Sequence, residues 1–321
     1  MTSKQRLATL ALFPALAFTC NAAAATQPAT PAIAATTAAT PAKAAATPVA
    51  ATPAKPAAVP TPAAVPVKAA APAMAATSTS LNSVIAGKWR DPKNAARDVY
   101  RHPNETLTFF GVKPDQTLIE ITPGGGWYSE LLAPLLNEGG HYIAAVAKPG
   151  KPDGEAAQGK SALATKFAAD SAHYGHAKTI EFDPKAPNFG APNSVDTVLT
   201  FRNVHNWVMG GTQAAMFKAF FDVLKPGGVL GVTDHRANPG AATDGMHGYL
   251  TEKQVVDYAT AAGFVLDGKS EINANPKDTK DYPHGVWTLP PTLSQGNHNQ
   301  GSYLKIGESD RMTLRFVKPK K

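Results

Sequence analysis

Residues 116–136, QTLIEITPGGGWYSELLAPLL, contain the three parts from which an α/β unit is built. The short apolar and β-branched run at 117–121 predicts a strand, and it carries a single acid, Glu120. Three consecutive glycines follow at 124–126, and Trp127 begins an amphipathic segment. Glycines let the backbone adopt positive φ and approach a bound molecule, and the N–H groups of a following helix can hold an anion. The stretch predicts a ligand-binding turn, and an ordinary glycine-rich turn is the alternative.

Residues 1–25 have the layout of a secretory signal peptide. Lys4 and Arg6 precede an apolar run at 7–18, and small residues end at Ala25. We therefore expect cleavage after Ala25 and a periplasmic or secreted protein. The apolar run is shorter than a helix that spans a bilayer, so a permanent anchor is the less favoured alternative.

Cys20 is the only cysteine. Phe18 and Thr19 before it do not favour lipid attachment, and cleavage after Ala25 would remove it. The exported chain would then have no disulfide, thiol nucleophile or cysteine metal ligand. Because no later segment has the length and apolarity of a spanning helix, we expect no integral membrane segment in the mature chain.

Residues 26–80 consist almost wholly of Ala, Pro, Thr and Val, which predicts a disordered linker before a domain at 81–321. The whole chain has a net charge of +7, but its first 80 residues hold five basic residues and no acid. The remaining 26 basic and 24 acidic residues leave the domain at only +2. Basic and aromatic residues are not interleaved there, so we expect no nucleic-acid partner.

Strands and helices are predicted to alternate through the domain. Further strands are expected at 141–147, 179–182, 197–201, 229–232, 264–266 and 311–317, and helices at 91–101, 104–110, 127–136, 161–173, 213–224 and 252–262. Pro134 is expected to interrupt its helix, and residues 225–228, Lys-Pro-Gly-Gly, to form a sharp turn. This order predicts a mainly parallel sheet with helices on both faces, whose ligands bind beyond the carboxyl ends of the strands. Those ends carry polar residues, namely Asp183, Asn203, His205, Asp234, His235 and Arg236.

Three motifs in this order identify a likeness to a known family: IEITPGGGW at 119–127, FRNVHNW at 201–207 and FFDVLKPGGVLGVTDHR at 220–236. Residues 91–319 resemble a class I S-adenosylmethionine-dependent methyltransferase. With YRHP at 100–103 and the later SEINANP, DTKD and GVWTLPP, they resemble in particular the predicted exported bacterial methyltransferases. The resemblance implies a Rossmann-like fold with a mainly parallel seven-stranded sheet, S-adenosyl-L-methionine as cofactor and a small-molecule substrate.

The resemblance also implies roles for individual residues. The amino acid part of the cofactor would lie against Glu120 and the turn of Gly124, Gly125 and Gly126, the adenine would lie near Asp183, and the methyl group would face Asn203 and His205. The sequence departs from the family pattern at two points. Thr122 occupies the position of the first glycine, and the acid for the ribose is missing directly after the second strand, where Lys148 stands. Asp153 and Glu155 are the nearest substitutes.

Methyl transfer requires alignment of donor and acceptor and removal of a proton from some acceptors. His205 and His235 are the candidate bases, because a histidine can accept a proton near neutral pH. Asn203 is a candidate for holding the substrate. A packed structural role is the alternative for each.

Several other side chains are weaker candidates. Tyr100, Arg101 and His102 are candidates to close over the site, and Tyr282 and Trp287 to shape the acceptor pocket. Arg236 is a candidate for binding an acidic substrate, with a structural ion pair as the favoured alternative. No metal site is expected.

Three functions are compatible with these patterns. The first is a methyltransferase acting on a small-molecule or envelope-associated substrate. The second is a binding module that keeps the fold without turnover. The third is a nicotinamide-dependent oxidoreductase, which is least favoured because its Gly-x-Gly-x-x-Gly pattern would need glycine where Ser129 stands.

Overall fold

The structure is a computed structural model that describes residues 80–148 and 155–320. The predicted signal peptide at 1–25 lies outside the described residues, as does the predicted linker at 26–80 except for Ser80. Their predictions therefore stay predictions.

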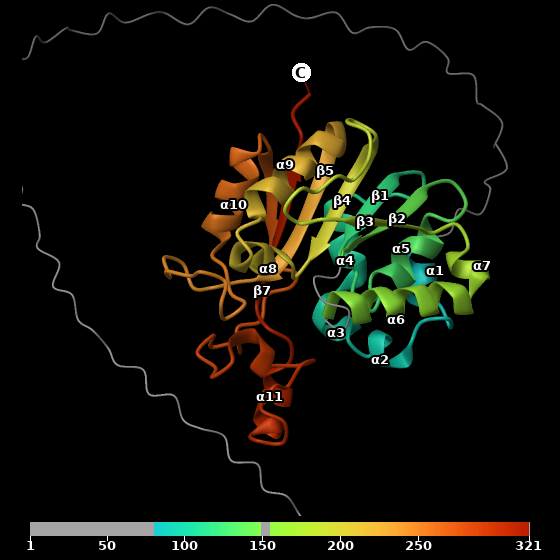
Figure 1. The fold of residues 1–321 in the computed structure, drawn as a ribbon. Coiled ribbons are helices and arrows are strands. Elements are labelled where there is room, and N and C mark those ends of the chain that lie inside the picture. Colours follow the sequence, from blue (N-terminus) through green and yellow to red (C-terminus); the bar gives the residue numbers. More distant parts are fainter. Residues whose placement is uncertain (1–79, 149–154, 321) are drawn as a thin grey trace, which may run out of the picture. The chain divides into compact units, whose positions relative to one another are not determined.

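A seven-stranded sheet with the strand order β3-β2-β1-β4-β5-β7-β6 forms the centre of the described unit (Figure 1). The strands are β1 (Thr117–Ile121), β2 (His141–Ala147), β3 (Lys178–Phe182), β4 (Val195–Phe201), β5 (Leu224–His235), β6 (Val265–Ser270) and β7 (Arg311–Val317). Only β7 runs antiparallel to its neighbours β5 and β6, and the other pairs are parallel. The predicted mainly parallel seven-stranded sheet is confirmed.

Helices cover both faces of the sheet. They are α1 (Leu81–Ile85), α2 (Pro92–Ala95), α3 (Asp98–Arg101), α4 (Pro103–Phe110), α5 (Ser129–Leu135), α6 (Glu155–Ala169), α7 (Ser171–Tyr174), α8 (Val204–Met209), α9 (Gln213–Val223), α10 (Glu252–Ala261) and α11 (Gln300–Ile306), with a 3-10 turn, η1, at Gly285–Thr288. Strand β1 contributes to both cores because its side chains alternate: Leu118 packs with α4 and α5, and Ile119 packs with α9 and α10. Glu120 shares the face of Leu118.

The helix predicted at 91–101 is two short helices, α2 and α3. Asp91 caps α2 as expected, since its side chain accepts a hydrogen bond from the Lys93 amide. A continuous helix would then pair the Asn94 carbonyl with the Asp98 amide. Instead, Trp127 Nε1 donates to the Asn94 carbonyl over 2.7 Å. The Asn94 carbonyl thus accepts from the Trp127 indole and the Arg97 amide, and the helical hydrogen-bond pattern is interrupted between α2 and α3.

The predicted interruption at Pro134 was wrong, because Pro134 lies inside α5. Proline has no N–H, so it leaves the carbonyl four residues earlier, that of Glu130, without its helical donor. Trp89 Nε1 donates to this carbonyl over 3.0 Å. A side chain from outside the helix thus compensates for the missing bond.

The turn predicted at 225–228 lies within β5 as an irregular stretch. The register of β5 against β4 shifts between Val195 and Thr197, and Gly227 has a φ of 83°. The extra residues are therefore accommodated as a bulge and do not end the strand.

Among the described residues, no helix combines the length and apolar character needed to cross a membrane.

Candidate active site

A cavity of about 860 Å³ opens at the carboxyl ends of β1, β4 and β5. Its lining includes residues from the glycine turn, from α2 and α3, and from the connection between β6 and β7. We call the part of the cavity wall formed by Glu120 and residues 122–125 the acidic side. The part formed by Arg97, Arg101 and Arg202 is called the arginine side. Asn203, His205 and His235 line the cavity as well.

The glycine turn has the backbone conformation that a ligand-binding turn needs. Gly124 has a φ of 59°, and a Cβ placed there would meet nothing within 4 Å. Gly125 also lines the cavity, but Gly126 does not. A Cβ at Gly126 would lie 2.9 Å from Leu163 Cδ1, and its φ is 81°. Gly124 therefore leaves open space beside the cavity, and Gly126 allows α6 to pack closely.

Thr122 also adopts the left-handed conformation, with a φ of 50°. This conformation is strained for a β-branched residue. The backbone at this position thus has the positive φ that glycine adopts readily, although the side chain is threonine.

Glu120 is buried beneath the turn and is held by two hydroxyl groups. Its Oε2 accepts hydrogen bonds from Tyr142 Oη over 2.6 Å and from Ser129 Oγ over 3.1 Å. Among the described residues, Oε1 has no hydrogen-bond partner. Burial raises the pKa of Glu120 to about 7, although the two hydroxyls oppose the shift. Glu120 can therefore serve as an acceptor for a ligand's donor groups at the cavity wall.

Asn203 connects the ends of β1 and β4. Its Nδ2 donates to the Ile121 carbonyl over 2.9 Å and to Thr200 Oγ1 over 3.1 Å. Asn203 makes no side-chain capping bond to α8. Because Nδ2 is used within the protein, the acceptor Oδ1 is the group left to contact a ligand.

His205 is oriented by Asp234, which lies at the end of the neighbouring strand β5. His205 Nδ1 donates to Asp234 Oδ1 over 2.9 Å. Asp234 also accepts hydrogen bonds from the backbone amides of Val204, His205 and His235. These donors fix the carboxylate, which in turn fixes the imidazole tautomer and leaves Nε2 to accept a proton.

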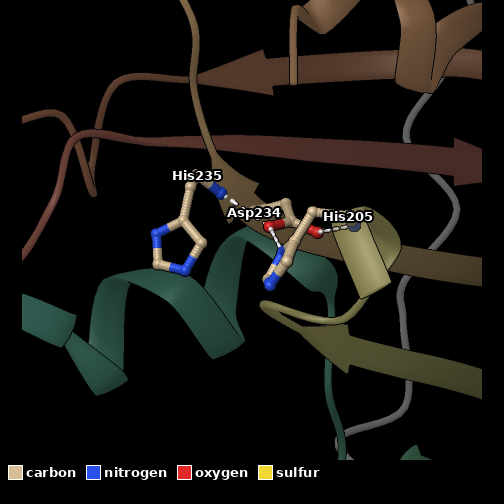
Figure 2. Close-up of side chains that lie close together, drawn as sticks. All are labelled: His205, Asp234 and His235. Atoms are coloured by element: carbon tan, nitrogen blue, oxygen red, sulfur yellow. Dashed lines mark hydrogen bonds and ion pairs between the residues drawn. The ribbon is translucent and has the colours of Figure 1, made fainter. Parts of the chain in front are cut away.

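His235 lies beside this pair, and its ring centroid is 5.1 Å from that of His205 (Figure 2). Its Nδ1 is hydrogen-bonded to Ser309 Oγ. Burial lowers the pKa of His235 well below its usual value, with further contributions from His205 and from Arg202, Arg311 and Arg101. His235 is therefore held in its neutral form.

His205, Asp234 and His235 also form a possible metal-binding group, with one potential ligand atom from each within 4.8 Å of the others. Two features disfavour a cation there. Both Asp234 oxygens already accept hydrogen bonds from the protein, and arginine side chains raise the positive potential around His235. The geometry favours a positioning role for Asp234 over metal ligation.

Asp183 is not brought to the cavity with the other candidates. It follows β3, and its side chain accepts a hydrogen bond from the Lys185 amide over 2.9 Å. Its predicted contact with an adenine stays a prediction. At the end of β2 the cavity is lined by Val146 and Ala147, and among the described residues that follow this strand none supplies an acid to the cavity wall.

The other candidates fall into two groups. Arg101 and Trp287 line the cavity, and Tyr100, His102 and Tyr282 are not among its lining residues. Arg236 forms ion pairs with Glu252, Glu271 and Asp310, so the favoured structural role is confirmed.

Sequence reasoning missed the rest of the arginine side and its counter-ion. Arg97 and Arg202 line the cavity with Arg101, and Glu308 forms ion pairs with Arg97 and Arg101 over 2.7 and 3.3 Å. Arg202 could have been found, because it directly precedes the candidate Asn203. Glu308 could not, since it lies 211 residues from Arg97 without a motif.

Comparison with known proteins supports the fold. No family model matches the chain, and no curated protein matches it. Among solved structures, the [4+2]-cyclase SpnF has 15% identity and a TM-score of 0.51, over 73% of this chain and 86% of that chain. A putative sarcosine dimethylglycine methyltransferase from Galdieria sulphuraria has 14% identity and a TM-score of 0.49, over 71% and 88%. A SAM-dependent methyltransferase from Aquifex aeolicus has 15% identity and a TM-score of 0.47, over 75% and 99%.

Two of these three solved structures are described as methyltransferases, and that from Aquifex aeolicus is described as SAM-dependent. At these identities the likeness concerns the fold alone. The predicted Rossmann-like fold of the class I methyltransferase type is confirmed.

Proposed function

We propose that the protein is an S-adenosylmethionine-dependent methyltransferase that acts on a small-molecule or envelope-associated substrate. One observation carries the proposal: His205, with its tautomer fixed by Asp234, lines the same cavity as Glu120 and the glycine turn. A candidate base and a candidate donor site therefore line one cavity.

The acidic side fits the amino acid part of the donor. Glu120 Oε1 offers an acceptor for an ammonium group, and a cation there would favour the ionised form of a carboxyl whose pKa burial has raised to about 7. Gly124 leaves space where a side chain would otherwise protrude. When bound, S-adenosylmethionine supplies an electrophilic methyl group.

The chain's own residues would prepare the acceptor. His205 Nε2 removes the proton from the acceptor atom, and Asp234 stabilises the imidazolium that forms. Asn203 Oδ1 accepts a hydrogen bond from the acceptor or donor and limits its rotation.

Titration calorimetry of the full chain with S-adenosylmethionine, S-adenosylhomocysteine and NAD tests the donor site. A broad acceptor screen with donor labelled in its methyl group tests turnover. We expect both adenosyl compounds to bind and label to reach at least one acceptor. Absence of binding by both adenosyl compounds would contradict the proposal, and NAD binding would favour the oxidoreductase alternative.

A binding module without turnover is the second candidate, motivated by the end of β2. Val146 and Ala147 line the cavity there, where an acid would otherwise hold a ribose. The fold alone does not require methyl transfer, because SpnF is described as a [4+2]-cyclase. Binding of S-adenosylhomocysteine without label transfer across the screen would favour this second candidate.

Export belongs to the proposal, as does membership of the exported bacterial group. Export rests on the signal-peptide layout of residues 1–25, and the likeness to that group rests on YRHP at 100–103 and the later SEINANP, DTKD and GVWTLPP. Fractionation of cells that express the full chain, with N-terminal sequencing of the product, tests this part. A chain that stays in the cytoplasm with residues 1–25 attached would contradict export.

A further inference from the structure

We propose that the methyl acceptor is an anion, with a carboxylate or phosphate group bound by Arg202 and Arg101 on the arginine side of the cavity. This inference rests on the proposed function and adds the chemical class of its substrate.

The arginine side carries more positive charge than its own acid can balance. Glu308 pairs with Arg97 over 2.7 Å, with Arg101 over 3.3 Å and with Arg311 over 2.8 Å. Arg202 interacts electrostatically with the same carboxylate. One glutamate thus faces four guanidinium groups, and an anion in the cavity would reduce the excess.

Arg101 has an unused donor in a buried position. Its side chain is only 3% exposed, lines the cavity, and has its Nη2 buried without a hydrogen-bond partner. Arg97 Nη2 is buried without a partner as well. A buried donor without an acceptor destabilises the protein, and a ligand oxygen would remove that cost.

Arg202 lies next to the candidate catalytic groups. It follows β4 with a φ of 61°, an uncommon conformation for a residue with a side chain, and it directly precedes Asn203. Within the part of the chain that the structure describes, its guanidinium makes no hydrogen bond or ion pair. Burial lowers its pKa, and Arg311 and Arg97 lower it further, while Glu308 opposes the shift. An anion bound here would place the acceptor beside His205.

The carboxylate of the donor does not account for this arrangement. A carboxylate forms its strongest contact with a single guanidinium through two parallel hydrogen bonds. The donor's amino acid part has only one such group, and the acidic side offers a site for the ammonium beside it. Four arginines against one glutamate leave enough positive charge for a second anion.

The test is calorimetry on the full chain saturated with S-adenosylhomocysteine, using inorganic phosphate and succinate as separate probes. We expect at least one probe to bind the wild type, and Arg202→Gln to weaken it about 10- to 100-fold. S-adenosylhomocysteine itself should bind Arg202→Gln within about threefold of the wild type, because Arg202 serves the acceptor. The stronger probe distinguishes a phosphate from a carboxylate substrate.

Two further variants make the test specific. Lys253→Gln removes an equal charge from a side chain that is 83% exposed, and it should leave probe binding unchanged. Arg101→Lys keeps the charge but loses the forked donor, and it should weaken the probe less than Arg202→Gln does. Circular dichroism confirms that each variant is folded.

Two results would overturn the inference: neither probe binds the wild type, or Arg202→Gln weakens S-adenosylhomocysteine as much as the probe. In the second case Arg202 would hold the donor. If S-adenosylhomocysteine does not bind at all, the proposed donor fails separately. The probes are then titrated alone, and binding that depends on Arg202 would still support an anion site.

Discussion

Two buried glutamates, Glu120 at the cavity wall and Glu308 paired with the arginine side, respond to burial in opposite ways. Glu120 is 2% exposed and Glu308 is 3% exposed. The pKa of Glu120 is raised to about 7 by burial, against the opposing hydrogen bonds of Tyr142 and Ser129. Burial also opposes ionisation of Glu308, but the nearby arginines outweigh it and hold its pKa well below the usual value. Partners, and not burial alone, therefore set the charge of each side.

Because of this difference, the two sides of the cavity carry charges of opposite sign. The acidic side suits a cationic group of a ligand, and the arginine side suits an anionic one. Two ligands of opposite charge could therefore lie in one volume in a fixed orientation, with His205 available to both. A variant that alters one side can therefore be compared with the unaltered other side.

The largest effect is expected from His205→Gln, which removes the base while leaving both charged sides intact. Turnover should fall about 100- to 10,000-fold, because general base catalysis contributes a factor of this size. Label transfer to an acceptor found in the screen measures it, and calorimetry with S-adenosylhomocysteine should show unchanged affinity. His235→Gln is the matched control and should have a smaller effect. Equal losses in both variants would contradict the assignment of the base.

Glu308→Gln removes the negative charge that pairs with the arginine side. The variant leaves the buried Arg101 and Arg311 and the partly buried Arg97 without their counter-ion. The free energy of unfolding should fall by about 3–5 kcal/mol, measured by chemical denaturation. Asp222→Asn, in an exposed pair with Lys218, is the control and should cost less than about 1 kcal/mol.

The contribution of Glu308 to the free energy of unfolding should also depend on pH. Because folding lowers the pKa of Glu308, its stabilising effect is complete above the ordinary value of 4.5 and is lost progressively as the pH falls below it. The difference between wild type and Glu308→Gln should therefore shrink in acid. A difference that grows below pH 4.5 would contradict the ion-pair account.

Glu120→Gln sharpens the comparison from the other side. Loss of the carboxylate should weaken S-adenosylhomocysteine about 10- to 150-fold at pH 8, as expected for a hydrogen bond to a charged group. In the wild type the affinity should fall as the pH drops below about 7, because protonated Glu120 carries no charge to attract the ammonium. Calorimetry between pH 6 and 8 measures both effects. Adenosine has no ammonium and is the control ligand. If the affinity of the wild type for S-adenosylhomocysteine did not depend on pH, Glu120 would not be the group that binds the ammonium.

The smallest effect is expected from Thr122→Gly in the acidic side. Glycine relieves the left-handed strain of Thr122, worth about 1–2 kcal/mol, but loses more backbone entropy on folding. The free energy of unfolding should therefore rise by no more than about 1 kcal/mol. Thr179→Gly in strand β3 is the control and should be destabilising. A clear loss of stability in Thr122→Gly would show that the side chain has a structural role of its own.

The sequence was sufficient for features that depend on local patterns. The predicted bounds of β1, β2 and β7 agree with the structure. β1 and β2 are mainly apolar runs, and in β7 apolar residues recur among polar ones. The capping box of Thr251 and Gln254 at α10 has a local signature as well and lets the start of that helix be read directly.

Contacts between segments that are distant in the sequence could not be predicted from local patterns. Asp234 was recognised at a strand end, but its bond to His205 depends on β4 and β5 being neighbours. Tyr142 reaches Glu120 because β2 pairs with β1 in the observed register. The two tryptophan bonds that reshaped the predicted helices are likewise tertiary. Pairing of strands and packing of helices decide these contacts, and neither leaves a periodic signal in one chain.

The position of β7 between β5 and β6 has a consequence for biosynthesis. Ribosomes make Arg97 and Arg101 long before Glu308, so these side chains emerge without a counter-ion and the free edge of β5 emerges without its neighbour. Non-local pairing of this kind slows folding and leaves hydrophobic surface and unpaired strand edges exposed to aggregation. The domain should therefore reach a binding-competent state only after residues 311–317 have been made and β7 has paired with β5 and β6.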